Sequence, residues 1–163
     1  YNIPQCTGNR LSLDVVIRLA THYDNIVGLK DSSGDLQTLF ATNLLHDGQF
    51  NTAIGPDESI LAGVAMGLDA AVSGHANVVP EMVVGIYNAT VAGNMEEAQK
   101  LQRNFNRVRS ALSDPRNLSV WKGVLEYRGV PMGGVRPPLL TATEGTIKDA
   151  INKLIALGAL ESK

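Results

Sequence analysis

Short apolar runs alternate with amphipathic segments along the first 93 residues of the chain. The apolar runs predict strands at about 1–4, 25–30, 50–54 and 70–73. Apolar residues at helical spacing predict a helix after each strand, at about 13–23, 35–46, 58–66 and 80–92. Strands that alternate with helices form parallel sheets with right-handed crossovers, so the pattern predicts four consecutive βα units.

After Gly93 the pattern changes to helices alone, which are expected at about 95–112, 117–128 and 145–160. Four βα units are half of an eight-stranded barrel, and a complete (β/α)8 barrel needs about 250 residues. This chain has 163 residues. Residues 1–93 therefore fit either an open four-stranded sheet or half of a TIM barrel, and residues 94–163 form a carboxyl-terminal helical extension.

The composition is that of an ordinary globular protein. Hydrophobic residues make up 44% of the chain and charged residues 18%, which excludes a disordered polypeptide. The net charge of −2 gives no reason to expect a nucleic acid or an anionic membrane as a partner. A single cysteine, Cys6, excludes an internal disulfide framework and predicts a cytoplasmic protein.

Neither a metal, a nucleotide nor a membrane is expected from the sequence. The histidines His22, His46 and His75 lack the spacing and the flanking cysteines of a metal site. The chain has no glycine-rich phosphate loop, no apolar run of about 18 residues and no signal peptide. It begins at Tyr1 without an initiator methionine, so we expect a processed, cut or incompletely recorded polypeptide.

The apolar run from Asn25 to Leu29 ends at Lys30, and Asp31-Ser32-Ser33-Gly34 follows. An uncharged run of this kind predicts a strand that is buried on both faces. Barrels and open α/β sheets place their chemistry at the carboxyl ends of strands, so Lys30 is a candidate amine nucleophile toward a carbonyl. The alternative is a lysine whose stem lies along apolar surface while its amine reaches water, which is the commoner case for an isolated lysine.

Three further loops with polar groups follow predicted strands: Tyr1-Asn2, Gly55–Glu58 and Ser73–Asn77. If the strands are neighbours in chain order, these loops and Lys30 converge on one rim of the sheet. A phenol near an amine suits imine chemistry, in which protons move on and off oxygen. Each signal is weak alone: Tyr-Asn-x-Pro is commonly a turn, Gly-x-Asp-Glu commonly starts a helix, and His75 is expected to be a satisfied or exposed histidine.

These motifs stand in a specific order along the chain: Tyr1–Pro4 with Thr7-Gly8, Gly28–Asp35, Gly55 with Asp57, Val72–Asn77, and Arg136-Pro137-Pro138 near the end. In this order they resemble the pyruvate-dependent class I aldolase superfamily of dihydrodipicolinate synthase and N-acetylneuraminate lyase. The resemblance covers essentially the whole chain, from barrel strand five to the terminus. It implies an α/β fold, the second half of a (β/α)8 TIM barrel with four βα units, followed by a three-helix extension.

The resemblance also implies roles for individual residues. Lys30 would form an imine with the keto carbon of pyruvate or another 2-keto acid, without any dissociable cofactor. Tyr1 would move protons during imine formation and during carbon–carbon bond making or breaking. The substrate-binding residues would be Ser32, Gly55, Asp57, Glu58, and Val72 and Gly74, whose backbone would line the pyruvate pocket.

Departures from the family patterns bear on the substrate. Cys6 stands where dihydrodipicolinate synthases usually carry an arginine that holds a substrate carboxylate, and a thiol cannot make that bidentate ion pair. Glu58 beside Asp57 is similar to the sialate lyases, whereas Thr7-Gly8 and Arg136 are closer to 2-keto-3-deoxy sugar acid aldolases. We therefore expect a lyase that joins or separates pyruvate and an aldehyde, acting on a 2-keto-3-deoxy sugar acid or a related 2-keto acid.

Other functions remain open at this point. The same imine would serve a condensation of the dihydrodipicolinate synthase type or a keto-acid dehydratase. The family's carboxylate-binding Gly-Thr-Thr segment belongs to the first half of the barrel, so the missing amino-terminal half is an expected partner. A half-barrel alone would expose apolar strand faces and two sheet edges, which favours a homo-oligomer or a non-catalytic, self-associating fragment.

Overall fold

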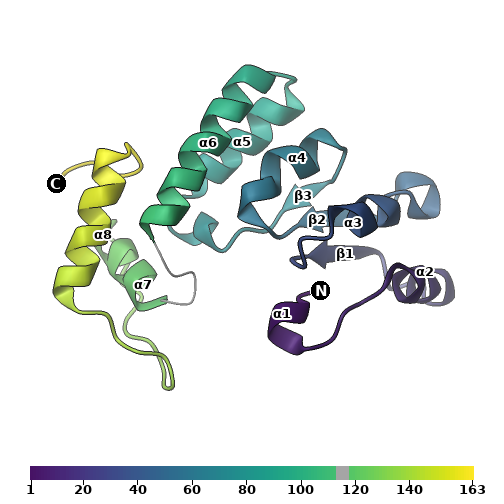
Figure 1. Ribbon diagram of the computed structural model, residues 1–163, viewed down its shortest axis with the longest axis horizontal. Coiled ribbons are helices and arrows are strands. Elements are labelled where there is room, and N and C mark those ends of the chain that lie inside the picture. The colour runs from purple at the N-terminus through teal and green to yellow at the C-terminus, as the bar shows by residue number, and fades with distance from the viewer. Residues whose placement is uncertain (113–117) are drawn as a thin grey trace. The chain divides into compact units, whose positions relative to one another are not determined.

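The structure is a computed structural model that describes residues 1–112 and 118–163 (Figure 1). The chain forms two compact units. The first unit comprises residues 1–73 and 83–102, and the second comprises residues 74–82 and 103–163. Among the described residues, no helix combines the length and the apolar character that a membrane-spanning segment needs.

The first unit contains a parallel sheet whose strands lie in chain order: β1 (Gly28–Asp31), β2 (Asn51–Ile54) and β3 (Ala70–Ala71). Lys30 lies opposite Ala53 in this sheet. Asn2 forms a parallel bridge with Asp31. In this bridge Asn2 N donates to Lys30 O (2.9 Å), and Ser32 N donates to Asn2 O (2.8 Å). Four parallel segments therefore follow one another in chain order, as the alternation of strands and helices predicts.

Helices follow each of these segments. In the first unit they are α1 (Pro4–Thr7), α2 (Leu13–His22), α3 (Leu36–Thr42), η1 (Leu45–Gly48), η2 (Asp57–Ser59) and α4 (Ile60–Ala65), where η marks a 3-10 helix. The helices α5 (Pro80–Val91) and α6 (Met95–Ala111) form a hairpin whose turn is closed by a bond from Asn94 N to Ala89 O (2.9 Å). Pro4 lies in the first turn of α1 instead of closing a strand, because its missing N–H and fixed φ suit that position.

Two polar residues cap the amino-terminal ends of helices α2 and α3. Ser12 Oγ accepts a hydrogen bond from Val15 N (3.4 Å). The Asp35 carboxylate accepts from Thr38 N (3.0 Å) and from Thr38 Oγ1 (2.8 Å). These two hydrogen bonds hold the pKa of Asp35 below its usual value, and the charge of Arg10, 3.4 Å away, acts in the same direction.

Burial alternates along β1, so its two faces differ. Leu29 and Asp31 are buried, whereas Gly28 and Lys30 are more exposed. Helix α3 packs against β1 and β2. The buried apolar residues of this unit include Leu29, Leu39, Phe50, Ile54 and Ile60. The prediction that residues 25–29 form a strand buried on both faces is wrong for this chain, because β1 begins at Gly28 and Val27 is 59% exposed.

The second unit is helical in its described part. It contains η3 (His75–Asn77), the end of α6, α7 (Leu118–Tyr127) and α8 (Glu144–Ala156), and α7 packs on α8. The buried apolar residues of this unit include Phe105, Val108, Val120, Val124 and Leu154. Helices are thus present near all three positions predicted after residue 94, although residue 117, the expected start of one, lies outside the described residues.

Candidate active site

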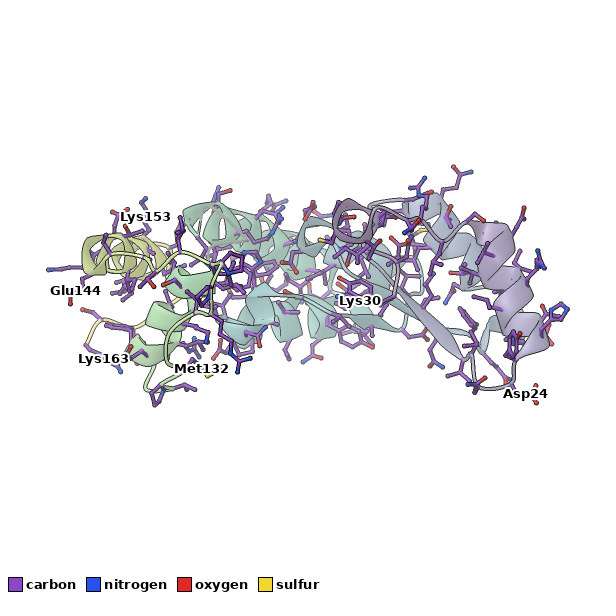
Figure 2. The ribbon with its side chains drawn as sticks, turned by 90° about the horizontal axis from the view of Figure 1, so that it is seen from below. Asp24, Lys30, Met132, Glu144, Lys153 and Lys163 are labelled. Carbon is purple, nitrogen blue, oxygen red and sulfur yellow. The ribbon has the colours of Figure 1, made fainter. Side chains whose placement is uncertain are left out.

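Lys30 and Tyr1 lie together on the sheet of the first unit. Lys30 Nζ is 4.1 Å from the centroid of the Tyr1 ring, which is the distance of a cation–π contact. Lys30 lies on the more exposed face of β1. Figure 2 labels its side chain. Tyr1 is held beside it because the next residue, Asn2, bridges to β1. The amine and the phenol that the sequence places at two strand ends are therefore neighbours in space.

Ser32 joins this pair through its hydroxyl group. Tyr1 Oη and Ser32 Oγ are 3.2 Å apart, and either oxygen can donate the hydrogen bond between them. Ser32 follows directly after β1, and Gln5 Nε2 donates to its carbonyl oxygen (2.7 Å). An amine, a phenol and an aliphatic hydroxyl thus form one cluster, and such a set of groups is suited to passing protons to and from a substrate oxygen.

A buried hydrogen-bond network around Asp31 fixes Asn2 and Ser33, the residues next to Tyr1 and Ser32 in the chain. Asp31 and Asn2 are each only 2% exposed. Asn2 Nδ2 donates to Asp31 Oδ2 (2.5 Å), and Ser33 N and Ser33 Oγ donate to Asp31 Oδ1 (2.7 and 2.6 Å). Asn2 Oδ1 in turn accepts from Leu11 N (3.1 Å). No role for Asp31 follows from the order of strands and helices. The signal in the sequence that points to Asp31 is Asp-Ser-Ser-Gly, which favours a turn built around the aspartate side chain.

Gly55 lies at the end of β2 against the same cluster. Gly55 N donates to Asp31 O (2.7 Å). A Cβ at this position would overlap the Ser32 hydroxyl oxygen and would lie 2.6 Å from Asp31 O. A glycine is therefore needed for Ser32 to lie where it meets Tyr1, and the structure brings together Tyr1, Lys30, Ser32 and Gly55.

Asp57, Glu58 and Val72 follow strands at the same carboxyl end of the sheet. Asp57 is 7% exposed within η2, whereas Glu58, beside it, is exposed. Val72 is 47% exposed, and its N–H donates to Ile54 O (2.9 Å) at the end of β2. Of these three, Glu58 and Val72 are accessible to a ligand. A direct contact of the Asp57 carboxyl with substrate remains a prediction.

Gly74 and His75 belong to the second unit. A Cβ at Gly74 would lie 3.3 Å from the Trp121 ring. The His75 ring is 4.6 Å from that of Trp121 and 6.1 Å from that of Phe105, centroid to centroid. His75 is only 5% exposed, so the interpretation of a satisfied histidine fits the structure and that of an exposed one is wrong.

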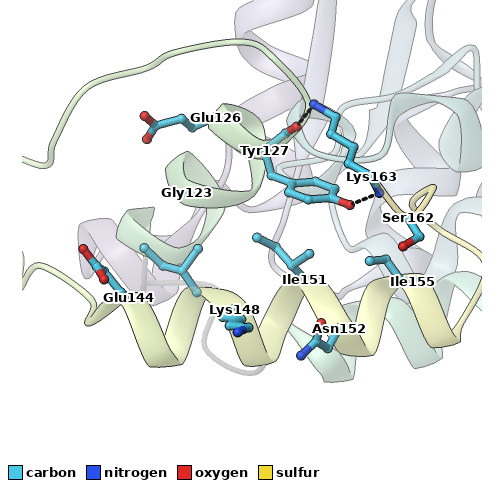
Figure 3. A pocket seen from close by; sticks show the side chains of 11 residues that line it. Gly123, Glu126, Tyr127, Glu144, Lys148, Ile151, Asn152, Ile155, Ser162 and Lys163 are labelled. Atoms are coloured by element: carbon cyan, nitrogen blue, oxygen red, sulfur yellow. Dashed lines mark hydrogen bonds between the residues drawn. The ribbon is translucent and has the colours of Figure 1, made fainter.

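A second lysine–tyrosine pair lies in the second unit. Lys163 Nζ is 5.0 Å from the Tyr127 ring centroid and donates to Tyr127 O, and Lys163 N donates to Tyr127 Oη (2.9 Å). The pair borders a pocket of about 500 Å³ between α7 and α8, which Ile151 and Ile155 line from α8 (Figure 3). This amine is bound by a carbonyl beside an exposed tail and does not follow a strand, so Lys30 is the better candidate for imine chemistry.

Residues 1–112 and 118–163 contain no group of three or more His, Cys, Asp or Glu side chains that is arranged to hold a metal ion. Cys6, in α1, is an exposed free thiol.

Comparison with known proteins gives consistent matches. The model of the family described as dihydrodipicolinate synthetase family matches residues 1–156. The 4-hydroxy-tetrahydrodipicolinate synthase of Methanopyrus kandleri is 34% identical over 160 residues, which cover 98% of this chain and 53% of that protein. An Escherichia coli protein named "Probable 2-dehydro-3-deoxy-D-pentonate aldolase" is 34% identical over 161 residues, which cover 95% of this chain and 53% of that protein.

Solved structures match as well. That of a Ruminococcus gnavus sialic acid aldolase, described as a catalytic lysine mutant, aligns with a TM-score of 0.86 at 25% identity. The alignment covers 97% of this chain and 53% of the aldolase. The chain thus spans about half the length of the relatives that it matches, and its α/β fold matches about half of the chain of these solved structures.

Proposed function

The chain belongs to the dihydrodipicolinate synthetase family, and from this premise we propose that it is the imine-forming part of a pyruvate-dependent class I aldolase. The observation that carries the proposal is the cluster in which Lys30 Nζ lies 4.1 Å from the Tyr1 ring and Tyr1 Oη lies 3.2 Å from Ser32 Oγ. The sialic acid aldolase with a matching fold is described as having a catalytic lysine. Lys30 is the candidate for that role here.

In the proposed reaction the neutral amine of Lys30 attacks the keto carbon of a 2-keto acid. The resulting carbinolamine loses its hydroxyl group as water and becomes a protonated imine. The imine accepts the electron pair of the carbon–carbon bond that breaks, so the aldehyde leaves and an enamine of pyruvate remains. Protonation of the enamine carbon and hydrolysis of the imine then release pyruvate and restore the amine. The condensation runs through the same steps in reverse.

Tyr1 and Ser32 serve the proton transfers of these steps. The Tyr1 hydroxyl donates a proton to the departing carbinolamine oxygen and accepts one from the aldol hydroxyl as the carbon–carbon bond breaks. Ser32, hydrogen-bonded to it, holds the phenol in place and contacts the second substrate. The Tyr1 ring next to Lys30 Nζ also shields the amine on one side from water.

The favoured substrate is a 2-keto-3-deoxy sugar acid or a related 2-keto acid. Cys6 offers a thiol where a guanidinium would hold the carboxylate of a dihydrodipicolinate synthase substrate, and it is exposed in α1. Glu58 offers an exposed carboxylate, which accepts hydrogen bonds from sugar hydroxyls. The Escherichia coli relative, named for a 2-dehydro-3-deoxy-pentonate, supports this substrate class.

The proposed active form contains a complementary amino-terminal half of the barrel. The chain covers 53% of the Methanopyrus kandleri relative, and Lys30 lies on the more exposed face of β1. In this form residues 1–93 form the half-barrel, residues 94–163 follow as a carboxyl-terminal helical extension, and Val72 and Gly74 line the pyruvate pocket with their backbone. We propose a cytoplasmic homo-oligomer that uses no cofactor other than the covalent imine.

Product analysis tests this function. Residues 1–163, alone and joined to the amino-terminal half of a family member, are incubated with 2-keto-3-deoxygluconate, and pyruvate and the aldehyde are quantified. We expect both products in equal amounts from the joined protein and none from its Lys30→Met variant. A dehydrated or hydrated keto acid in place of these products would show a dehydratase, and equal activity of the Lys30→Met variant would exclude the proposed mechanism.

An exposed apolar surface on α2 favours self-association of the isolated chain as a second candidate property. Val15, Leu19 and Tyr23 form an apolar stripe on α2 and the turn after it, and they are 40%, 36% and 57% exposed. Apolar residues in such a stripe are commonly covered by a neighbouring element. The isolated chain is therefore expected to associate in solution. Sedimentation of a compact, well-folded monomer would contradict the self-association.

A further inference from the structure

Gln102 reaches from α6 to the start of α4 within the first unit. Its side chain is buried, and the residue is 6% exposed. Gln102 Nε2 donates to Asp57 O (3.0 Å), and Gln102 Oε1 accepts from Leu61 N (3.0 Å). A residue of the carboxyl-terminal helices is thus bonded to the loop that carries Asp57 and Glu58.

The two backbone groups that Gln102 binds are natural partners of each other. Asp57 and Leu61 are four residues apart, and in a continuous α-helix the N–H of one would donate to the carbonyl of the other. Here the Gln102 amide stands between them and binds both. Ser59, with φ −113° and ψ 10°, lies outside helical geometry at the junction of η2 and α4. The Gln102 side chain therefore binds on both sides of the point where the helical geometry is interrupted, between the η2 turn with Asp57 and Glu58 and helix α4.

Glutamine is suited to this position by its chemistry. Its amide offers one donor group and one acceptor group, which match a carbonyl and an N–H at the same time. A glutamate would keep the acceptor for Leu61 N but would face Asp57 O with a second oxygen. A methionine of similar length would leave both backbone groups without this partner.

We propose that Gln102 is a positioning residue for substrate recognition. By fixing the carbonyl of Asp57, it sets the direction of the η2 turn, and with it the place of the Glu58 carboxylate at the end of the sheet that carries Lys30. Glu58 then meets the hydroxyl groups of a 2-keto-3-deoxy sugar acid whose keto carbon is bound at Lys30. This inference rests on the proposed function and assigns it a determinant of substrate class.

The test compares two substrates in the joined protein described above. One is 2-keto-3-deoxygluconate, and the other is 4-hydroxy-2-oxobutanoate, which lacks the distal hydroxyl groups. In Gln102→Met we expect KM for the sugar acid to rise by about tenfold or more, since a displaced positioning group costs of that order. We expect KM for the short keto acid, and the yield of the borohydride-reduced pyruvate adduct, to stay within about twofold.

Thr90→Val is the matched control. Thr90 is 7% exposed in α5, and its hydroxyl donates to Ile86 O (2.7 Å), so the variant also loses a buried hydrogen bond in the first unit. We expect Thr90→Val to lower Tm without changing the ratio of the two KM values. If Thr90→Val changes that ratio as much as Gln102→Met does, the effect is one of stability and the inference is wrong.

Gln102→Glu and hydrogen exchange give a second readout that does not depend on catalysis. In the 163-residue chain, the Leu61 amide is expected to exchange faster in Gln102→Met than in Gln102→Glu, which retains an acceptor for it. Equal exchange in both variants would overturn the inference, as would an unchanged KM ratio in Gln102→Met. A parent protein that forms no pyruvate adduct would instead refute the proposed function, and the substrate role of Gln102 with it.

Discussion

Gly55 offers a sharp test of how the candidate site is packed, because the change needed is a single methyl group. In Gly55→Ala the new Cβ would overlap the Ser32 hydroxyl oxygen, and it would lie 2.6 Å from Asp31 O and 2.9 Å from Ser32 Cα. The last two of these neighbours are backbone atoms, so rotation of the serine side chain relieves the overlap with the hydroxyl oxygen but not these two contacts. The strands must separate locally, which strains the bond from Gly55 N to Asp31 O (2.7 Å).

The expected cost follows from these contacts. Overpacking and a weakened backbone hydrogen bond together lower the free energy of unfolding by about 2–4 kcal/mol. In urea this moves the midpoint of unfolding down by about 1–2 M, given the usual dependence of stability on denaturant for a small protein. Circular dichroism of the 163-residue chain in a urea series measures the midpoint.

Gly134→Ala is the control, because no described atom lies within 4 Å of a Cβ at that glycine. It is expected to change the free energy of unfolding by less than about 0.5 kcal/mol. The double variant Ser32→Gly with Gly55→Ala should recover part of the loss, since one of the overlaps disappears while that with Asp31 O remains. An unchanged midpoint in Gly55→Ala, or strict additivity in the double variant, would refute this account of the packing.

Three further predictions concern the same unit. Tyr1→Phe keeps the ring beside Lys30 but removes the hydroxyl that is hydrogen-bonded to Ser32. We expect kcat for aldol cleavage to fall by a factor of about 10²–10⁴, while the pyruvate adduct still forms. An unchanged kcat would show that Tyr1 takes no part in the proton transfers. Asp31→Asn places an amide donor against that of Asn2 and should lower the free energy of unfolding, measured in urea, by about 1–3 kcal/mol. Asp24→Asn, at an exposed position, is the control and should lower it little. Equal losses in the two variants would contradict the role of the Asp31 network. The pKa of Asp35 is lowered in the folded chain, so its contribution to stability is present above the ordinary value of 3.8 and is lost as the pH falls through the folded pKa. Asp35→Asn keeps an N-cap residue but removes the titrating group, so the urea midpoint should fall less in the variant than in the parent as the pH is lowered. An equal fall in both proteins would contradict this role of Asp35.

The order of the strands and helices could be predicted because each element carries its own periodic pattern. Lys30 was placed at a strand end for that reason. The exposure of β1 could not be predicted from the same pattern. An apolar run such as 25–29 indicates what a strand can bury, but it does not indicate that β1 begins only at Gly28 or that Val27 is 59% exposed.

The candidate site was predictable where its groups lie at the carboxyl ends of strands, as Lys30 does within β1 and as Ser32 and Gly55 do directly after β1 and β2. Tyr1, Lys30, Ser32 and Gly55 meet because parallel strands bring their carboxyl ends to the same edge. Asn2 with Asp31, and Gln102 with the carbonyl of Asp57, were missed because these bonds join residues 29 and 45 positions apart. Polar contacts of this kind depend on how the helices and strands pack, and no periodic pattern in the sequence predicts them.

The central claim is that Lys30 is the amine that forms an imine with a 2-keto acid, and peptide mapping after reduction tests it most directly. The joined protein is incubated with pyruvate and sodium borohydride, digested and analysed by mass spectrometry, with Lys163 as an internal comparison because it too lies beside a tyrosine ring. We predict one reduced pyruvyl group on Lys30 and none in Lys30→Arg. An adduct on Lys163 or another lysine, with Lys30 unmodified, would contradict it.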